Sequence, residues 1–310
     1  MYSVTKEQVL STIPGSDRVP RCTDLSGFPR SFLDVPYSHR SPALRLDLVL
    51  PNQGEGPFPT VVFIHGGGWL TGDKSHVQTQ SVYRLLYAGY AVCCLNYRLS
   101  DEAKWPLPLH DCKAAIRFLR ANARRFCLDT ERIGVVGNSA GGHLAAMLGT
   151  TNGQPEYEDL TMGCPDASSD VQAVFVWFGI YDFLNWESDW NAAYPDRPFP
   201  ETVSAEAYLF GHPLRAFPQR LAHASPICQL SAQTVPFYVE HGTADHAVPY
   251  IQCVRFYERY VQLLGKENIS IRLFASAEHS DPVFRQDENV FEFVRFFDRH
   301  IRQIPPRDFF

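Results

Sequence analysis

The five residues GNSAG at positions 137–141 have the types and spacing of a serine nucleophile on a tight turn. They follow the apolar run Arg132–Val136 and lead into Ala140–Leu148, which has helical spacing. In the pattern G-x-S-x-G, glycines leave room for a strained strand-to-helix turn that exposes the serine hydroxyl at the end of a sheet. A helix cap would also explain Ser139, but a cap, worth about 1 kcal/mol, needs no glycine on either side. The sequence therefore predicts Ser139 as the nucleophile of an acyl-transfer reaction.

A second glycine run, HGGGW at His65–Trp69, follows the apolar stretch FPTVVFI. Backbone N–H groups of such a run, with that of Ala140, can bind the oxygen that becomes negative in a tetrahedral intermediate. A phosphate cradle is the alternative, but neither GK[ST] nor G-x-G-x-x-G is present here. We therefore expect an oxyanion hole. Trp69 beside it either lines the substrate pocket or packs in the core, and we also expect substrate contacts from Asn138 and Tyr181.

A serine hydroxyl needs a base, and in a nucleophile-elbow architecture the chain order is Ser, acid, His. Beyond the helical stretch Ala140–Leu148, the histidines are His212, His223, His241, His246, His279 and His300. His279 lies in a loop between the apolar run ISIRLFASA and the last helical stretch, at the C-terminal end of a strand, where such sheets build their sites. We therefore predict His279 as the general base.

Two aspartates compete for the acid position. Asp245 lies in HGTADHAVP just after the run VPFYVE, and Asp182 in GIYDF lies one strand earlier. We predict Asp245 as the acid, which would hold the imidazole tautomer and stabilise the imidazolium. Asp182 would then cap a turn or a helix.

The elements that must position these groups alternate between two kinds. Short apolar runs predict strands at Leu44–Leu50, Thr60–Ile64, Tyr90–Leu95, Arg132–Val136, Val171–Trp177, Pro236–Glu240 and Ile269–Ala275. Stretches with helical spacing lie at Val77–Ala88, Leu109–Phe126, Ala140–Leu148, Tyr250–Leu264 and Glu288–Ile301. Such alternation predicts an α/β fold with a mostly parallel sheet covered by helices on both faces. The first run alternates apolar and charged residues, which indicates a half-exposed strand near an edge.

The sheet requires strands from before His65 to after Asp245, so we expect a single domain over residues 1–310. Residues 1–31 would form an N-terminal extension. The segment at about 180–235 is rich in aromatic residues and prolines, and we expect it to form a lid or cap insertion over the site.

The composition of the chain bears on whether it binds nucleic acid, a membrane or a metal. The chain of 310 residues has 28 Lys and Arg against 34 Asp and Glu, a net charge of -6, so nucleic acid is an unfavourable partner. The first residues argue against a secretory signal, and because no apolar segment is long enough, we expect no membrane span. Its eight cysteines form no C-x-x-C pair, so we expect no metal site and reduced thiols in a cytoplasmic protein. No cofactor is expected, and the sequence leaves a homodimer open.

The motifs HGGGW, GNSAGG, HGTADHAVP and EHSDPVF together resemble α/β-hydrolases of the esterase/lipase superfamily. The stretches HGGGW-xx-GDK, LNYRLS and WPLPLHDCKAAIRFLR narrow the resemblance to the carbohydrate-esterase-like group named after a bifunctional feruloyl and acetyl-xylan esterase. The hormone-sensitive-lipase and kynurenine formamidase groups are its neighbours. The resemblance covers about Phe32 to His300, and it implies that the backbone N–H groups of Gly67, Gly68 and Ala140 form the oxyanion hole. Glu278 departs from it, because many relatives have glycine there.

The predicted reaction is hydrolysis of small or short-acyl carboxylic esters through a Ser-His-Asp triad and a covalent acyl-enzyme. An amidase of the kynurenine formamidase type would use the same residues. A non-catalytic ligand-binding protein is the third alternative, and the presence of all three triad residues argues against it.

Overall fold

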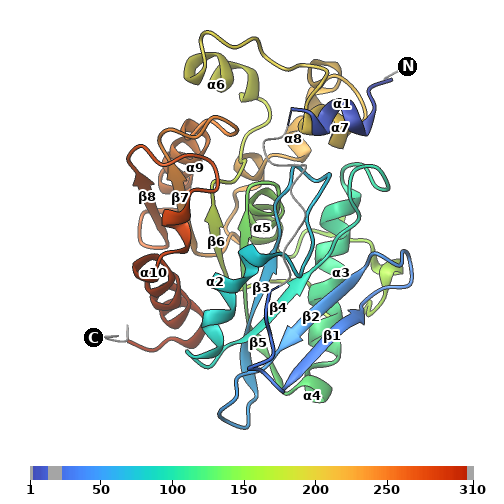
Figure 1. Cartoon of the computed structure of the whole chain (residues 1–310), viewed down its shortest axis with the longest axis vertical. Helices are drawn as coiled ribbons and strands as arrows, with labels where there is room; N and C mark the ends of the chain where they lie inside the picture. The colour runs from blue at the N-terminus through green and yellow to red at the C-terminus, as the bar shows by residue number, and fades with distance from the viewer. Residues whose placement is uncertain (1–2, 13–22, 306–310) are drawn as a thin grey trace.

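An eight-stranded sheet forms the centre of the computed structural model, which describes residues 3–12 and 23–305 (Figure 1). Its strands are β1 (Ser31–Pro36), β2 (Arg45–Val49), β3 (Phe58–Ile64), β4 (Ala91–Leu95), β5 (Leu128–Asn138), β6 (Ala173–Trp177), β7 (Phe237–Gly242) and β8 (Ile269–Phe274). The spatial order is β1-β2-β4-β3-β5-β6-β7-β8. The β1–β2 and β2–β4 pairs are antiparallel, and every pair from β4 to β8 is parallel. The prediction of a mostly parallel sheet is confirmed.

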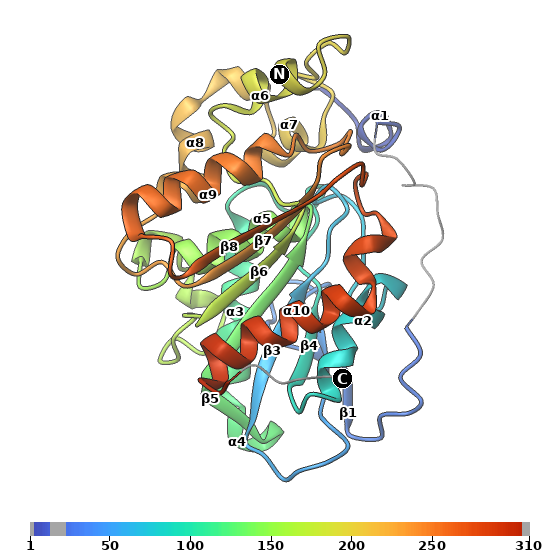
Figure 2. The ribbon, with the colours of Figure 1, turned by 90° about the vertical axis from the view of Figure 1, so that its left-hand side faces the viewer.

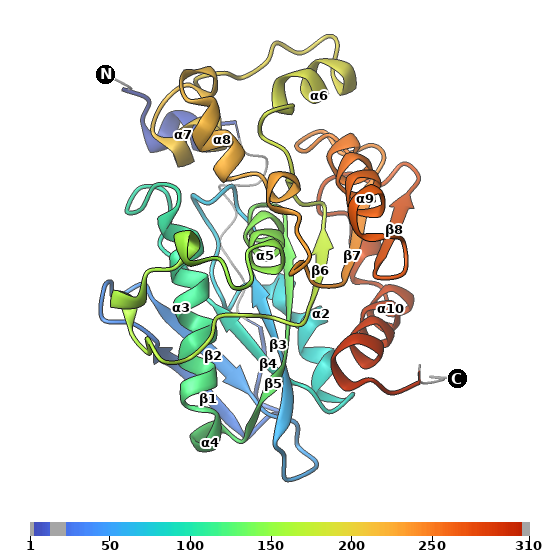
Figure 3. The same ribbon diagram turned by 180° about the vertical axis from the view of Figure 1, so that it is seen from behind.

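Helices cover both faces of this sheet. The α-helices are α1 (Lys6–Leu10), α2 (Gln80–Tyr83), α3 (Leu107–Ala121), α4 (Ala123–Phe126), α5 (Ala140–Thr150), α6 (Trp186–Ala193), α7 (Ala205–Phe210), α8 (Pro218–His223), α9 (Ile251–Leu264) and α10 (Asp287–Phe297). Short 3₁₀ turns occur at η1 (Val77–Thr79), η2 (Arg84–Leu86), η3 (Pro155–Tyr157), η4 (Leu160–Met162), η5 (Leu214–Ala216), η6 (Pro226–Gln229) and η7 (Pro282–Arg285), and a π-helical turn at η8 (Asp298–Arg302). In Figure 2, α2 and α10 lie on one side of the sheet and α9 on the other. Figure 3 shows α3, α5 and α9 together on that second face.

The central strands are apolar at every position because both of their faces are buried. In β3, Val62 and Ile64 join the core cluster that includes α3, α5 and α9, whereas Val61 and Phe63 join the cluster that includes α2 and α10. Successive side chains of a strand point to opposite faces, so a strand between two helix layers needs apolar residues throughout. This explains why VVFI lacks the polar alternation of a half-exposed strand.

Several sequence expectations need correction. One edge strand, β1, was not predicted: it begins at Ser31, the last residue of the predicted extension 1–31, of which residues 1–2 and 13–22 lie outside the described residues. The run Leu44–Leu50 is not half-exposed, because Asp47 is buried and its carboxylate lies 3.1 Å from Lys74 Nζ. Two predicted helices are divided: Val77–Ala88 into η1, α2 and η2, and Leu109–Phe126 into α3 and α4.

The segment between β6 and β7 contains α6, α7, η5, α8 and η6 and lies at the carboxyl end of the parallel strands (Figure 1). We call residues 180–235 the cap segment. Helix α1 contacts α7, so the N-terminal helix lies beside the cap segment. The parallel strands all end beneath it, and this arrangement brings the loops that follow β3, β5, β7 and β8 together.

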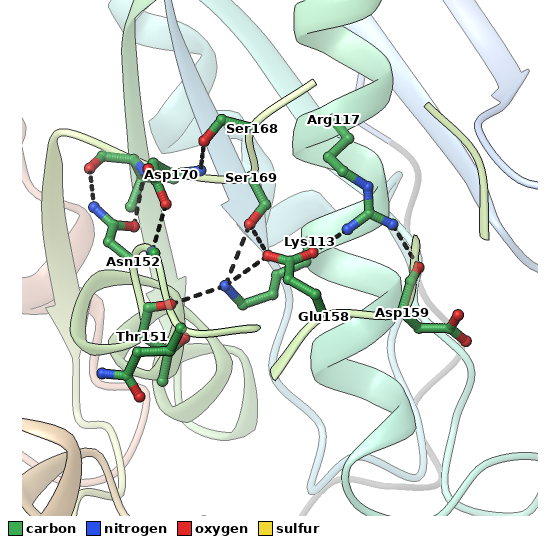
Figure 4. A network of polar contacts seen from close by, with 12 residues as sticks. Lys113, Arg117, Thr151, Asn152, Glu158, Asp159, Ser168, Ser169 and Asp170 are labelled. Atoms are coloured by element: carbon green, nitrogen blue, oxygen red, sulfur yellow. Dashed lines mark hydrogen bonds and ion pairs between the residues drawn. The ribbon is translucent and has the colours of Figure 1, made fainter. Parts of the chain in front are cut away.

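A buried polar network fixes the long connection between α5 and β6. Figure 4 shows Lys113 and Arg117 extending from α3 to Glu158 in this connection. Lys113 Nζ donates to Thr151 O, Glu158 Oε1 and Ser169 Oγ at 3.1–3.2 Å, and Arg117 pairs with the other oxygen of Glu158. Both cations are almost completely buried, so one carboxylate compensates two buried positive charges. Burial lowers the pKa of Lys113.

Candidate active site

Ser139 lies on a strained turn between β5 and α5. Its backbone has φ 53° and ψ -122°, a conformation that residues with a Cβ rarely adopt. The turn is tight because α5 starts against the end of β3: a Cβ on Gly141 would lie 2.1 Å from the carbonyl oxygen of Ile64. Ser139 itself is only partly buried, and it lines a cavity at this end of the sheet.

Three side chains form a continuous hydrogen-bonded chain. Ser139 Oγ lies 2.9 Å from His279 Nε2, and His279 Nδ1 lies 2.7 Å from Asp245 Oδ2. Because the carboxylate can only accept, Nδ1 carries the proton and Nε2 is left to accept the proton of the serine hydroxyl. The ring of Phe178 packs edge-on against His279 with centroids 4.7 Å apart, which restricts the imidazole. The structure therefore brings together the three residues selected from the sequence.

Asp245 accepts four hydrogen bonds. Its Oδ1 accepts from the backbone N–H groups of Ala247 (2.8 Å) and Val248 (2.9 Å), and its Oδ2 accepts from His279 and from His241 Nε2 (3.1 Å). Burial alone would raise the pKa of this carboxyl, but the charge of His279 and the hydrogen bonds from His241 and His279 outweigh it and hold the pKa well below its usual range. Asp245 is therefore a carboxylate fixed in one orientation.

His241 was not selected from the sequence, yet it contacts the same carboxylate oxygen as His279. It is completely buried, and its Nε2 also lies 3.1 Å from the carbonyl oxygen of Val248. Both neighbours are acceptors, so Nε2 carries the proton and His241 donates. The signal that could have found it is its place in HGTADHAVP, four residues before Asp245, where a turn brings the two side chains together.

The glycine loop after β3 presents unused donors near Ser139. At Gly67, φ is 108° and a Cβ would lie 2.3 Å from Thr71 O, so the loop excludes other residue types there. Within the described residues, no acceptor bonds the N–H of Gly67 or Gly68. Ala140 opens α5, where backbone N–H groups are free of intrahelical partners. These three donors lie around the cavity in which Ser139 is exposed.

The three expected substrate contacts have different surroundings. Asn138 lines the cavity, but its Oδ1 accepts from Gly66 N (2.9 Å) and thus ties the glycine loop to the serine turn. Trp69 lies in the cavity wall with its side chain fully buried, edge-on to His143 at 5.4 Å, so it has a packing role. Tyr181 is not at the cavity: it is completely buried and stacks on Phe256 at 4.6 Å.

The cavity has a volume of about 1830 Å³ and is enclosed partly by the cap segment. Arg197 of the cap lies over the rings of Trp190 (4.8 Å) and Tyr194 (4.9 Å), and its Nη1 donates to His246 O at 2.7 Å. Tyr194 donates its hydroxyl hydrogen to the carbonyl oxygen of Asp245 at 2.7 Å. The cap segment is therefore bonded to the loop that carries Asp245.

Asp182, the rival acid, caps a turn. Its Oδ1 accepts from the backbone N–H groups of Leu184 (3.0 Å) and Asn185 (3.2 Å). Its carboxylate is thus used locally, in agreement with the role expected if Asp245 is the acid.

Within residues 3–12 and 23–305, no group of three or more His, Cys, Asp or Glu side chains is arranged to hold a metal ion. The seven cysteines in those ranges are free, and Cys22 lies outside them. Every helix in the same ranges is too short or too polar to cross a bilayer.

Comparison with known proteins places this site in context. The BD-FAE family model matches residues 46–260. Esterase LipC of Mycobacterium tuberculosis is 33% identical over 204 residues, which cover 66% of this chain and 48% of LipC. The chain spans about half the length of the curated relatives it matches.

Two solved structures are similar over most of the chain. A truncated form of a carbohydrate esterase from gut microbiota gives a TM-score of 0.80 at 27% identity, covering 90% of this chain and 99% of that one. A bifunctional GH43-CE protein of Bacteroides eggerthii gives a TM-score of 0.77 at 32% identity, covering 87% of this chain and 35% of that one.

Proposed function

Because the chain belongs to the BD-FAE family and has the α/β-hydrolase fold, we propose that it hydrolyses carboxylic esters through Ser139, His279 and Asp245. The observation that carries the proposal is the hydrogen-bonded chain from Ser139 Oγ through His279 to Asp245. The names of the relatives, an esterase and a carbohydrate esterase, support the same reaction class.

The first half of the reaction forms an acyl-enzyme. Ser139 Oγ attacks the carbonyl carbon while His279 Nε2 takes its proton, and the positive charge on the imidazole is stabilised by Asp245. The backbone N–H groups of Gly67, Gly68 and Ala140 bind the developing oxyanion, and each such donor is typically worth about 10²–10³ in rate. The alcohol leaves with the proton held by His279.

The second half repeats these steps with water. His279 removes a proton from water, the hydroxide attacks the acyl carbonyl, and Ser139 leaves with the proton. Small or short-acyl esters are the proposed substrates, and the cap segment at about 180–235 acts as the lid that selects among them.

The decisive experiment replaces the nucleophile. Ser139→Ala should lower kcat on p-nitrophenyl acetate by about 10⁶-fold while the circular dichroism spectrum and melting temperature stay close to those of the wild type. Retained turnover would refute the assignment. A fluorophosphonate probe should label the wild type at Ser139 and leave the variant unlabelled, which separates an enzyme from a ligand-binding protein.

The same residues can cleave an amide, so the substrate panel should include N-formylkynurenine beside acetyl, butyryl, long-chain and feruloyl esters. We expect short-acyl esters to give the highest kcat/KM. A higher value on N-formylkynurenine would assign the formamidase reaction instead.

A further inference from the structure

Three described arginines line the cavity, and two of them already interact with other groups of the protein. Arg84 forms an ion pair with Asp287. Arg197 lies against two aromatic rings and donates to His246 O. Arg285, at the end of η7, has no carboxylate within ion-pair distance among the described residues.

Arg285 lies close to the reacting groups. Its Nη1 donates to the carbonyl oxygen of Ser280, the residue after His279, at 3.2 Å. It also lines a small side cavity together with Asn138 and Phe178, the first next to Ser139 in the chain and the second in contact with His279. Its Nε and Nη2 groups make no hydrogen bond within the described chain.

Gln78 connects this guanidinium to a second donor, His76. The side-chain amide of Gln78 donates to Ser280 Oγ (3.3 Å), which also accepts from Arg285 Nη1 (3.4 Å). His76 lines the cavity, and its Nδ1 accepts from the backbone N–H of Gln78 at 3.3 Å, which places the ring proton on Nε2. Burial and then the charge of Arg285 lower the pKa of His76, so this imidazole is neutral at pH 7 and adds a donor without a second positive charge. Burial also lowers the pKa of Arg285, with Asp281 opposing it.

The described carboxylates that face the cavity form no ion pair with Arg285. Asp287 is paired with Arg84, and Glu278 is exposed. Glu206 lies on the cap side, and burial raises its pKa. Asp73, near His76, accepts from Ser75 and Asn96.

We propose that Arg285 and His76 form a subsite in the catalytic cavity for a carboxylate carried by the ester substrate. A carboxylate accepts charge-assisted hydrogen bonds from the planar fork of an arginine and fits the donors left free here. The subsite rests on the proposed ester hydrolysis, and it narrows the substrate class to acidic esters, such as half-esters of dicarboxylic acids or acylated hydroxy acids.

The test uses matched pairs of esters that differ in one charge. Mono-p-nitrophenyl succinate is compared with p-nitrophenyl butyrate for a charge on the acyl side, and 4-acetoxybenzoate with phenyl acetate for a charge on the alcohol side. In one of the pairs, Arg285→Gln should lower the ratio of kcat/KM for the acidic ester over the neutral one by at least about 10-fold, mainly through KM. Arg285→Lys should lose less of this ratio because it keeps the charge.

Arg84→Gln is the matched control, because it removes an arginine from the same cavity that is already paired. It should leave the ratio within about 2-fold of the wild type. An equal loss on acidic and neutral esters would show that Arg285 only supports the His279 loop through Ser280, and it would overturn the subsite. An unchanged ratio in both pairs would overturn it too.

A binding measurement separates failure of the subsite from failure of the proposed reaction. Calorimetric titration of mono-p-nitrophenyl succinate and of 4-acetoxybenzoate into Ser139→Ala should show binding for the ester whose charge reaches the subsite, and Arg285→Gln in the same background should weaken it at least about 10-fold. If no ester is hydrolysed by the wild type, the ester reaction fails and this titration still decides the subsite. If the Arg285→Gln substitution weakens the binding of neither ester, the subsite is refuted, whatever the kinetic results are.

Discussion

Glu240 on β7 is a buried carboxyl that takes no part in the proposed chemistry, and its ionisation should control stability. Its side chain is completely buried, and Oε2 accepts from Trp177 Nε1 (3.0 Å) and from Asn289 Nδ2. Oε1 has no hydrogen-bond partner among the described residues. Burial raises the pKa of Glu240 to about 8, although Asn289 and Arg272 oppose the shift.

The sign and size of the effect follow from proton linkage. The ordinary pKa is 4.5, so between pH 4.5 and about 8 the folded protein holds a proton that the unfolded chain releases. Stability therefore falls as pH rises through this window, by about 1.4 kcal/mol per pH unit. Ionisation of Glu240 should therefore lower the free energy of unfolding by about 3–5 kcal/mol in total, and this loss is complete above pH 8.

Glu240→Gln should remove this dependence. The amide is neutral at every pH, and its oxygen can accept the hydrogen bonds from Trp177 and Asn289. The free energy of unfolding, from urea titrations at pH 5, 7 and 9, should match the wild type within about 1 kcal/mol at pH 5. At pH 9 the variant should be more stable by about 3 kcal/mol or more.

Glu258→Gln, at an exposed position on α9, is the matched control and should shift stability equally at all three pH values. A difference between Glu240→Gln and the wild type that stays constant from pH 5 to pH 9 would refute the reasoning.

Three further substitutions test the site and its support. His241→Leu removes one hydrogen-bond donor from Asp245, so the carboxylate should stabilise the His279 imidazolium more strongly. The acid limb of the kcat/KM–pH profile should then move to higher pH. His241→Gln keeps a donor and should move this limb less. Glu158→Gln leaves two buried cations without a counter-charge and should reduce the free energy of unfolding by about 3 kcal/mol, measured by urea titration. Gly67→Ala places a Cβ against Thr71 and should lower kcat on p-nitrophenyl acetate by about 10²-fold.

Each of these has a control. For Glu158→Gln it is Glu156→Gln, an exposed neighbour that should change stability by less than about 0.5 kcal/mol. For Gly67→Ala it is Gly153→Ala, which also has positive φ but lies away from the cavity, and which should leave kcat unchanged. Identical pH profiles for His241→Leu and His241→Gln would contradict the donor role of His241.

The serine turn could be predicted from the sequence because its requirements are local. Glycines, an apolar run and a helical stretch follow one another along the chain, and Ser139 adopts the strained backbone that this order demands. The order of the acid and the base along the chain then left few candidates for Asp245 and His279. Local pattern and chain order together were enough to select all three residues that the structure places in one hydrogen-bonded chain.

Other features depend on tertiary contacts that no local pattern carries. β1 is short, contains Asp34 at φ 56° and shifts register between Phe32 and Val35, so its sequence lacks a regular strand pattern. Tyr181 follows a strand at the correct end of the sheet, but its ring is drawn into the core by Phe256 on α9. Nothing in the local sequence distinguishes His241 from the other histidines. Its role depends on the turn that brings Asp245 back to its side chain.

Hydrogen bonds join the cap segment to the loop of Asp245, the proposed catalytic acid, and this limits how the cavity can adapt to substrates. Tyr194 and Arg197 bond the carbonyl oxygens of Asp245 and His246, so displacement of this part of the cap would disturb the loop that orients His279. By contrast, Glu201 is bonded to Arg215 within the cap itself, and Pro198, Pro200 and Val203 near it line the cavity. We therefore expect displacement of the wall residues Pro198, Pro200 and Val203 to disturb the Asp245 loop less. Selection by shape should reside in this wall, and selection by charge at Arg285.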